Sequence, residues 1–72
     1  MNTTEAEAQS RLYQSNNVEL HRIQCTFHRG ILTLFGVVSS SRLRQVAQEF
    51  VGDLNGIQVI DNQLVIAEKG AP

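Results

Sequence analysis

The stretch Gly30-Ile31-Leu32-Thr33-Leu34-Phe35-Gly36-Val37-Val38 decides the fold of this chain. Arg29-Gly30 predicts a turn, and the apolar run that follows predicts a strand. One face of this strand carries Leu32, Leu34, Gly36 and Val38, and the other carries Ile31, Thr33, Phe35 and Val37. A strand of an antiparallel sheet with one solvated face normally alternates apolar and polar residues. The sequence therefore predicts a second apolar surface on this strand.

The residues before this strand predict a helix and a first strand. Thr3 or Thr4 can cap the helix, since Glu7 follows Thr4 at capping-box spacing. Its narrow apolar stripe consists of Ala8 and Leu12, extended by Ala6 and Tyr13, and Ser15-Asn16-Asn17 ends it. From Val18 the period changes to two, which predicts a strand with one buried face. On that strand the apolar residues Ile23, Cys25 and Phe27 alternate with Gln24, Thr26 and His28.

The residues after the decisive stretch predict a helix and a last strand. Ser39 or Ser40 is suited to cap the helix. Its apolar stripe follows the i, i+3, i+4 pattern and consists of Leu43, Val46, Ala47, Phe50, Val51 and Leu54. Asn55-Gly56 ends it, and residues 57–66 form a strand that buries Ile60, Leu64 and Ile66.

The order helix, strand, strand, helix, strand predicts an α+β fold of the αββαβ type. A hairpin joins the first two strands, and a right-handed crossover through the second helix adds the third. The result is a two-layer sandwich with a three-stranded mixed sheet and two helices on one face. At 72 residues the chain forms one domain, in which residues 1–17 form the N-terminal helix, 18–66 the core and 67–72 a flexible tail.

The same residues resemble the BON domain family, a bacterial module named after osmotic-stress and nodulation proteins. The resemblance covers residues 18–66, with the first helix as a looser extension. It rests on Ile23, Cys25, Phe27, Gly30, Leu32, Leu34, Gly36, Val38, Ala47, Gly56, Ile57, Asn62, Leu64 and Ile66. It implies an αββαβ sandwich and a non-enzymatic module that binds phospholipid surfaces or other proteins. It transfers no catalytic residue. It also suggests a periplasmic or envelope association, because family members often carry a signal peptide.

Composition excludes several other classes. The formal net charge is −1 and no basic stripe is visible, so we expect no nucleic-acid partner. The longest apolar segment, residues 31–38, is far shorter than the ~20 residues that span a bilayer. Neither a signal peptide nor a lipoprotein site is visible, and a single cysteine, Cys25, fits a reducing compartment. These features predict a cytoplasmic protein that does not cross a membrane.

No group of residues predicts catalysis, a metal site or a cofactor. On an extended strand His21 and Cys25 share a face and His28 points the other way, so the three do not converge on a metal. Burial in the core should raise the pKa of Cys25 rather than activate it. The serines at 39–41 are better explained by helix capping than by nucleophilic chemistry.

The predicted second apolar surface is the candidate binding site. Its residues are Ile31, Phe35, Val37 and Val65, with Val59 as a further member. A contiguous apolar patch on so small a domain predicts contact with an unidentified protein partner or self-association. In the alternative, the hairpin twists or the tail folds over these residues, and they form no binding surface. The alternative function is peripheral binding to a phospholipid surface, with headgroup contacts from Arg22, Arg29, Arg42 and Arg44.

Overall fold

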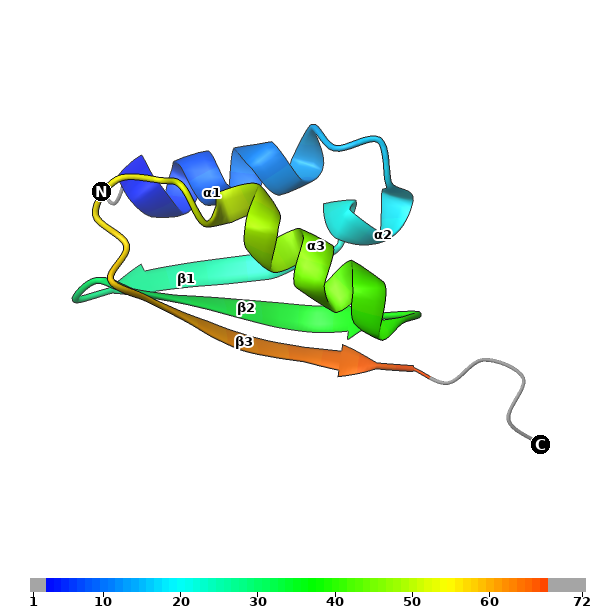
Figure 1. The fold of residues 1–72 in the computed structure, drawn as a ribbon. Helices are drawn as coiled ribbons and strands as arrows, with labels where there is room; N and C mark the ends of the chain where they lie inside the picture. Colours follow the sequence, from blue (N-terminus) through cyan, green and yellow to red (C-terminus); the bar gives the residue numbers. More distant parts are fainter. Residues whose placement is uncertain (1–2, 68–72) are drawn as a thin grey trace.

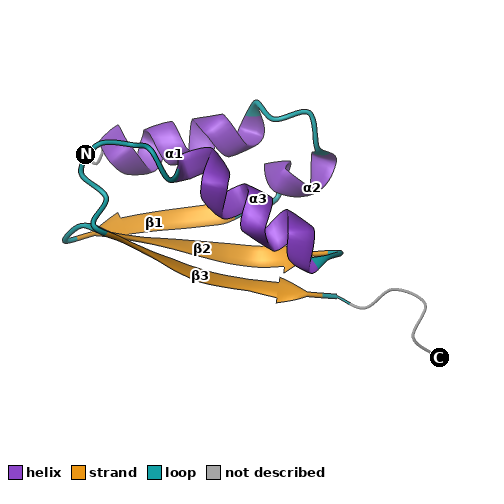
Figure 2. Cartoon of the chain, viewed as in Figure 1, coloured by secondary structure: helices purple, strands orange, loops and turns teal. Residues whose placement is uncertain are grey.

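The computed structural model describes residues 3–67 and has two layers, with helices on one side of a single sheet (Figures 1 and 2). The elements are α1 (Thr3–Tyr13), α2 (Val18–His21), β1 (Gln24–His28), β2 (Ile31–Val38), α3 (Ser41–Val51) and β3 (Val59–Ile66). The predicted α+β sandwich with a mixed sheet and helices on one face is confirmed. A short third helix, α2, joins the helical layer.

The sheet has the order β1-β2-β3, so β2 lies in the centre. β1 and β2 are antiparallel, and β2 and β3 are parallel. Arg29 (φ 52°) and Gly30 (φ 83°) both adopt left-handed backbone conformations, as a tight two-residue hairpin turn requires. Gly36 has a φ of 145° in the middle of β2, and a Cβ there would lie 3.4 Å from the Ile23 Cα. The absence of a side chain at this position lets the start of β1 approach β2 closely.

The strand predicted from Val18 was wrong over its first residues, because Val18–His21 form α2. The Asn17 side chain caps this helix by accepting from the Glu19 N–H at 2.9 Å. The Glu19 carboxylate in turn accepts from the Ser39 N–H at 2.8 Å and the Ser39 hydroxyl at 2.7 Å. These contacts fasten α2 to the loop between β2 and α3, and so favour the helical turn over an extended chain.

The predicted cap of α3 is confirmed, and that of α1 was wrong. Ser40 has an extended backbone, and its hydroxyl accepts from the Leu43 N–H at 3.2 Å. Thr4 lies inside α1, where its hydroxyl donates to the Asn55 carbonyl at 3.3 Å. This contact joins the first helix to the loop that follows α3.

The core lies between the helices and the sheet. Its buried hydrophobic residues are Ala8, Leu12, Leu20, Ile23, Cys25, Leu32, Leu34, Val38, Ala47, Val51, Leu54 and Leu64. Three residues assigned to apolar stripes from the sequence lie at the surface instead, namely Ala6, Tyr13 and Phe50. Tyr13 is exposed and packs against the His21 ring at a centroid distance of 5.3 Å, and Phe50 remains 38% exposed at the margin of α3. Both helices therefore bury a narrower stripe than their sequences suggest.

The predicted tail falls outside the described residues except for Ala67. The Ala67 N–H donates to the Val38 carbonyl at 2.8 Å, which extends the alignment of β3 with β2 by one residue.

Candidate functional site

The side of the sheet away from the helices, here called the open face, carries large apolar side chains. Because successive side chains of a strand point to opposite sides, the alternate residues of β2 and β3 project from this face. The exposed fraction is 43% for Ile31, 41% for Phe35, 58% for Val37, 54% for Val59 and 60% for Val65. The described residues leave these five side chains far more exposed than those of the core.

The strand register arranges these side chains as two apolar clusters. Val37 is the partner of Val65 at one end of the sheet, and Ile31 is the partner of Val59 at the other. Phe35 lies one alternate position from Val37 and so extends the Val37–Val65 cluster. Its own partners on β1 and β3 are polar, Gln24 and Gln63.

A polar row separates the two clusters. Thr33 on β2 has Thr26 of β1 on one side and Asp61 of β3 on the other. The Asp61 carboxylate accepts from the Gln63 Nε2 at 2.8 Å, so the row is hydrogen-bonded along β3 as well. The residues singled out from the sequence do share one face, and the structure shows that this face is apolar at both ends and polar between them.

The Val37–Val65 end of the open face continues around the sheet into a surface depression. Its lining residues are Val18, Glu19, Arg22, Val37, Val38, Ser39 and Ala67. Val18 is 64% exposed and adds an apolar side chain from α2. The sequence pattern did not predict this exposed side chain, because it assigned Val18 to a strand. The capping signal at Asn17 could have identified the helix that presents it.

The four arginines proposed as headgroup contacts lie on different parts of the molecule. Arg22 precedes β1 and Arg29 follows it, so they lie at opposite ends of that strand. Arg42 and Arg44 are on α3, in the helical layer. All four are exposed, but they do not form a cluster on the open face.

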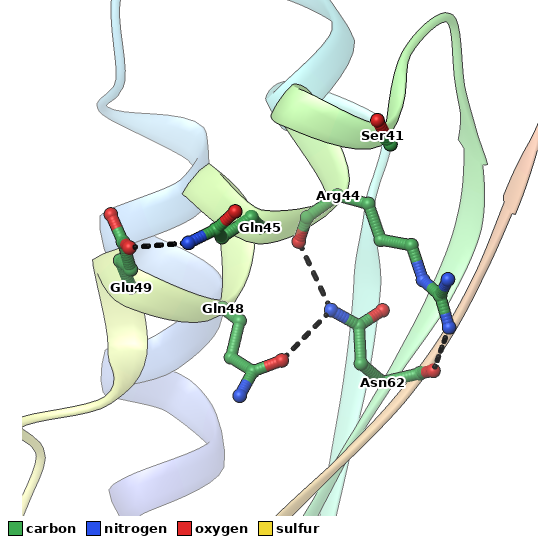
Figure 3. A pocket seen from close by; sticks show the side chains of 6 residues that line it. All are labelled: Ser41, Arg44, Gln45, Gln48, Glu49 and Asn62. Atoms are coloured by element: carbon green, nitrogen blue, oxygen red, sulfur yellow. Dashed lines mark hydrogen bonds between the residues drawn. The ribbon is translucent and has the colours of Figure 1, made fainter.

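A second depression, between α3 and β3, is polar (Figure 3). It is lined by Ser41, Arg44, Gln45, Gln48, Glu49 and Asn62. The Asn62 Nδ2 donates to the Arg44 carbonyl at 3.0 Å and to the Gln48 Oε1 at 3.1 Å, and the Gln45 Nε2 donates to the Glu49 Oε2 at 3.3 Å. The two bonds of Asn62 join β3 to α3 and so stabilise the packing of the helix on the strand.

Side chains of α1 occupy the outer edge of β1. The Gln9 Nε2 donates to the Ile23 carbonyl at 2.6 Å, and the Gln9 Oε1 accepts from the Cys25 N–H at 3.2 Å. One helical turn earlier, the Glu5 carboxylate accepts from the Phe27 N–H at 2.9 Å. α1 thus satisfies backbone groups that an edge strand would otherwise offer to another chain.

Comparison with known proteins places these features in a family. The model of the BON domain family matches residues 2–68, nearly the whole chain. The chain belongs to the BON domain family. The resemblance inferred from the glycines and apolar positions is therefore confirmed, including its extension over α1. No curated protein matches the sequence.

Among solved structures, this BON domain is similar to the C-terminal domain of CdsD, a structural protein of the type III secretion system of Chlamydia trachomatis. The TM-score is 0.71 at 24% sequence identity, over 90% of this chain and 32% of the CdsD chain. At this sequence identity, the similarity shows that the two domains share a fold and nothing more. This chain spans only about a third of the solved CdsD chain.

The titratable side chains of Cys25, His21 and His28 lie in different surroundings in this BON domain. Cys25 is buried beneath α1, and this burial, together with the charge of Glu5, raises the pKa of its thiol from 9.0 to about 11. The predicted direction of the shift is confirmed. The His21 ring contacts the Ser15 carbonyl through Nε2 at 2.7 Å, and His28 is exposed on the open face. Within residues 3–67, no three histidine, cysteine or acidic side chains are grouped to hold a metal ion.

None of the helices in the described part of the chain is long and apolar enough to cross a membrane.

Proposed function

We propose that this BON domain is a non-catalytic binding module that contacts another protein, or a second copy of itself, through the open face of its sheet. The observation that carries the proposal is the exposure of five large apolar side chains on one side of the sheet. Exposed apolar clusters bordered by polar residues are typical of contact surfaces, and the cluster of Val37, Val65 and Phe35 has this arrangement. Family membership and the likeness to a domain of a secretion-system structural protein also favour a binding or structural role over catalysis.

The Val37–Val65 cluster with Phe35 is the part of this surface that we expect to contribute most to the free energy of binding. Aromatic residues bury about 150–250 Å² each in interfaces, so the 41% of Phe35 that is exposed corresponds to roughly 80 Å². At ~25 cal/mol per Å², covering that area contributes about 2 kcal/mol, or ~30-fold in affinity. The valines and Ile31 add to this, before the general cost of association.

The charge distribution favours a protein surface over an anionic lipid surface. Net charge is −1, and Asp61 lies exposed in the middle of the open face. Binding to an anionic leaflet gains ~1 kcal/mol for each basic residue near it. Because Arg42 and Arg44 lie on α3 in the helical layer, a membrane facing the open face would gain nothing from them.

The test compares the Phe35→Ser and Phe50→Ser variants by sedimentation over a range of concentrations. The two phenylalanines are matched controls, because they are 41% and 38% exposed but lie on opposite layers of the domain. We expect Phe35→Ser to weaken self-association by at least ~10-fold and Phe50→Ser to leave it near that of the original chain. Equal self-association of both variants would refute self-association through the open face.

A second arm distinguishes the lipid alternative. Amide spectra are recorded with neutral and anionic vesicles at a fixed protein concentration. Broadening at residues 31–37 with anionic vesicles, without any concentration dependence in their absence, would support lipid binding and contradict self-association. Concentration-dependent shifts of the same residues without a vesicle effect would support the protein interface.

A further inference from the structure

The second edge of the sheet is formed by β3. No described strand pairs with the outer side of β3, but two side chains bind backbone groups there. The Val59 and Ala67 N–H groups donate towards β2, to the carbonyls of Gly30 and Val38. Because backbone groups alternate along a strand, those of the even-numbered residues 60, 62, 64 and 66 face the outer edge. Eight residues of extended chain, five of them apolar, form a template for another strand.

The side chains of Asn62 and Arg44 occupy the middle of that edge. The Asn62 Oδ1 accepts from the Leu64 N–H at 3.2 Å, so this outward N–H is already bonded within β3. The Arg44 Nη2 donates to the Asn62 carbonyl at 3.3 Å (Figure 3). The Asn62 side chain is held in place by its own donation to α3. One amide group and one guanidinium thereby bind two neighbouring backbone groups that a new strand would need.

We propose that Asn62 and Arg44 keep the β3 edge closed to strand addition by the β3 of a second copy of this chain. The occupant follows from the strand itself. Antiparallel pairing of two β3 strands centred on Asn62 places Val59 opposite Val65 and Asp61 opposite Gln63, so apolar residues meet and no like charges do. That pairing requires the Asn62 carbonyl and the Leu64 N–H, the two groups that are occupied.

The two edges are closed in different ways, which makes β3 the edge that can open. At β1 the groups come from α1, and Gln9 binds β1 through both ends of its amide. At β3 the guanidinium that binds the Asn62 carbonyl belongs to Arg44, an exposed residue with a long, flexible side chain. Loss of one exposed side chain would uncover the Asn62 carbonyl without removing a buried group.

The experiment uses the Phe35→Ser chain as background, so that association through the open face does not contribute. Into it are introduced Arg44→Ala, Asn62→Ala and both together, with Arg42→Ala as the matched loss of an exposed arginine from α3. Self-association is measured by sedimentation, and hydrogen exchange is measured at the amides of Ile60, Asn62 and Leu64. Far-UV circular dichroism and denaturant unfolding verify that each variant is folded.

We expect the double variant to dimerise at concentrations at least ~10-fold lower than Arg42→Ala, with amide protection along β3 that rises with concentration. Arg44→Ala alone should move in the same direction by a smaller factor. A folded double variant that matches Arg42→Ala in both measurements would overturn the proposal. If Asn62→Ala does not fold, Arg44→Ala decides: no increase in dimerisation relative to Arg42→Ala would equally overturn it.

Because the open-face proposal is tested by Phe35→Ser alone, the two proposals can fail separately.

Discussion

Replacing Gln9 by alanine should cost this domain a large part of its stability, although Gln9 is polar and lies on the helical layer. Its amide binds the Ile23 carbonyl at 2.6 Å and the Cys25 N–H at 3.2 Å, both part-buried at the outer edge of β1. A buried backbone group left without a partner costs about 1–3 kcal/mol. Since water can reach part of this edge, we expect the lower half of the range for each group, or about 2–4 kcal/mol together.

That loss is large because a domain of this size has little stability to lose. At ~0.05–0.15 kcal/mol per residue, 72 residues give roughly 4–11 kcal/mol. The assay is denaturant unfolding followed by far-UV circular dichroism, analysed by linear extrapolation. The control is Gln14→Ala, the same substitution at an exposed residue beyond the end of the same helix. A Gln9→Ala variant within ~0.5 kcal/mol of Gln14→Ala would refute the reasoning, since substitutions without such contacts fall in that range.

Two further predictions concern the core and the start of α3. Because burial raises the pKa of Cys25 from 9.0 to about 11, the unfolded chain loses the thiol proton first, so stability is full below pH 9 and falls as the pH rises towards 11. We expect a loss of up to ~2–3 kcal/mol over this span in pH-dependent unfolding, and Cys25→Ala should remove this part of the pH dependence. Ser40→Ala should lower the free energy of unfolding by ~1 kcal/mol through loss of the bond to the Leu43 N–H, whereas Ser41→Ala should change it little; equal effects of the two would contradict the assignment of the cap.

Much of the fold was predictable because its signals are local and periodic. The alternation along β2, the stripe of Ala47 and Val51 on α3, and the cap at Ser40 each depend on residues within a few positions of one another. The open face was predictable for the same reason, since a strand with apolar residues on both sides needs two covers and the chain supplies helices for one. Its division into two clusters required the register, which places Asp61 beside Thr33.

The features that sequence analysis missed depend on contacts between distant residues. The bonds from Glu5 and Gln9 to β1 join residues at least 14 positions apart, and neither residue belongs to an apolar pattern. In the same way, α2 is fixed by the bonds of Glu19 to Ser39, 20 positions away. A four-residue helix contains too little periodicity to be distinguished from the beginning of a strand. Exposure of Val18 follows from that helix and was missed with it.

A three-stranded sheet with one helical layer offers three routes to association: two edges and one face. In this domain α1 occupies the edge of β1, and Asn62 with Arg44 occupies the middle of the edge of β3. The open face is the route that these side chains leave available. A two-fold contact whose axis runs across the strands, along the row of Thr26, Thr33 and Asp61, would bring two Asp61 carboxylates together, which opposes association. We therefore expect a second copy to dock off-centre, over Phe35 and the Val37–Val65 pair, where the apolar surface is continuous and the carboxylates stay apart.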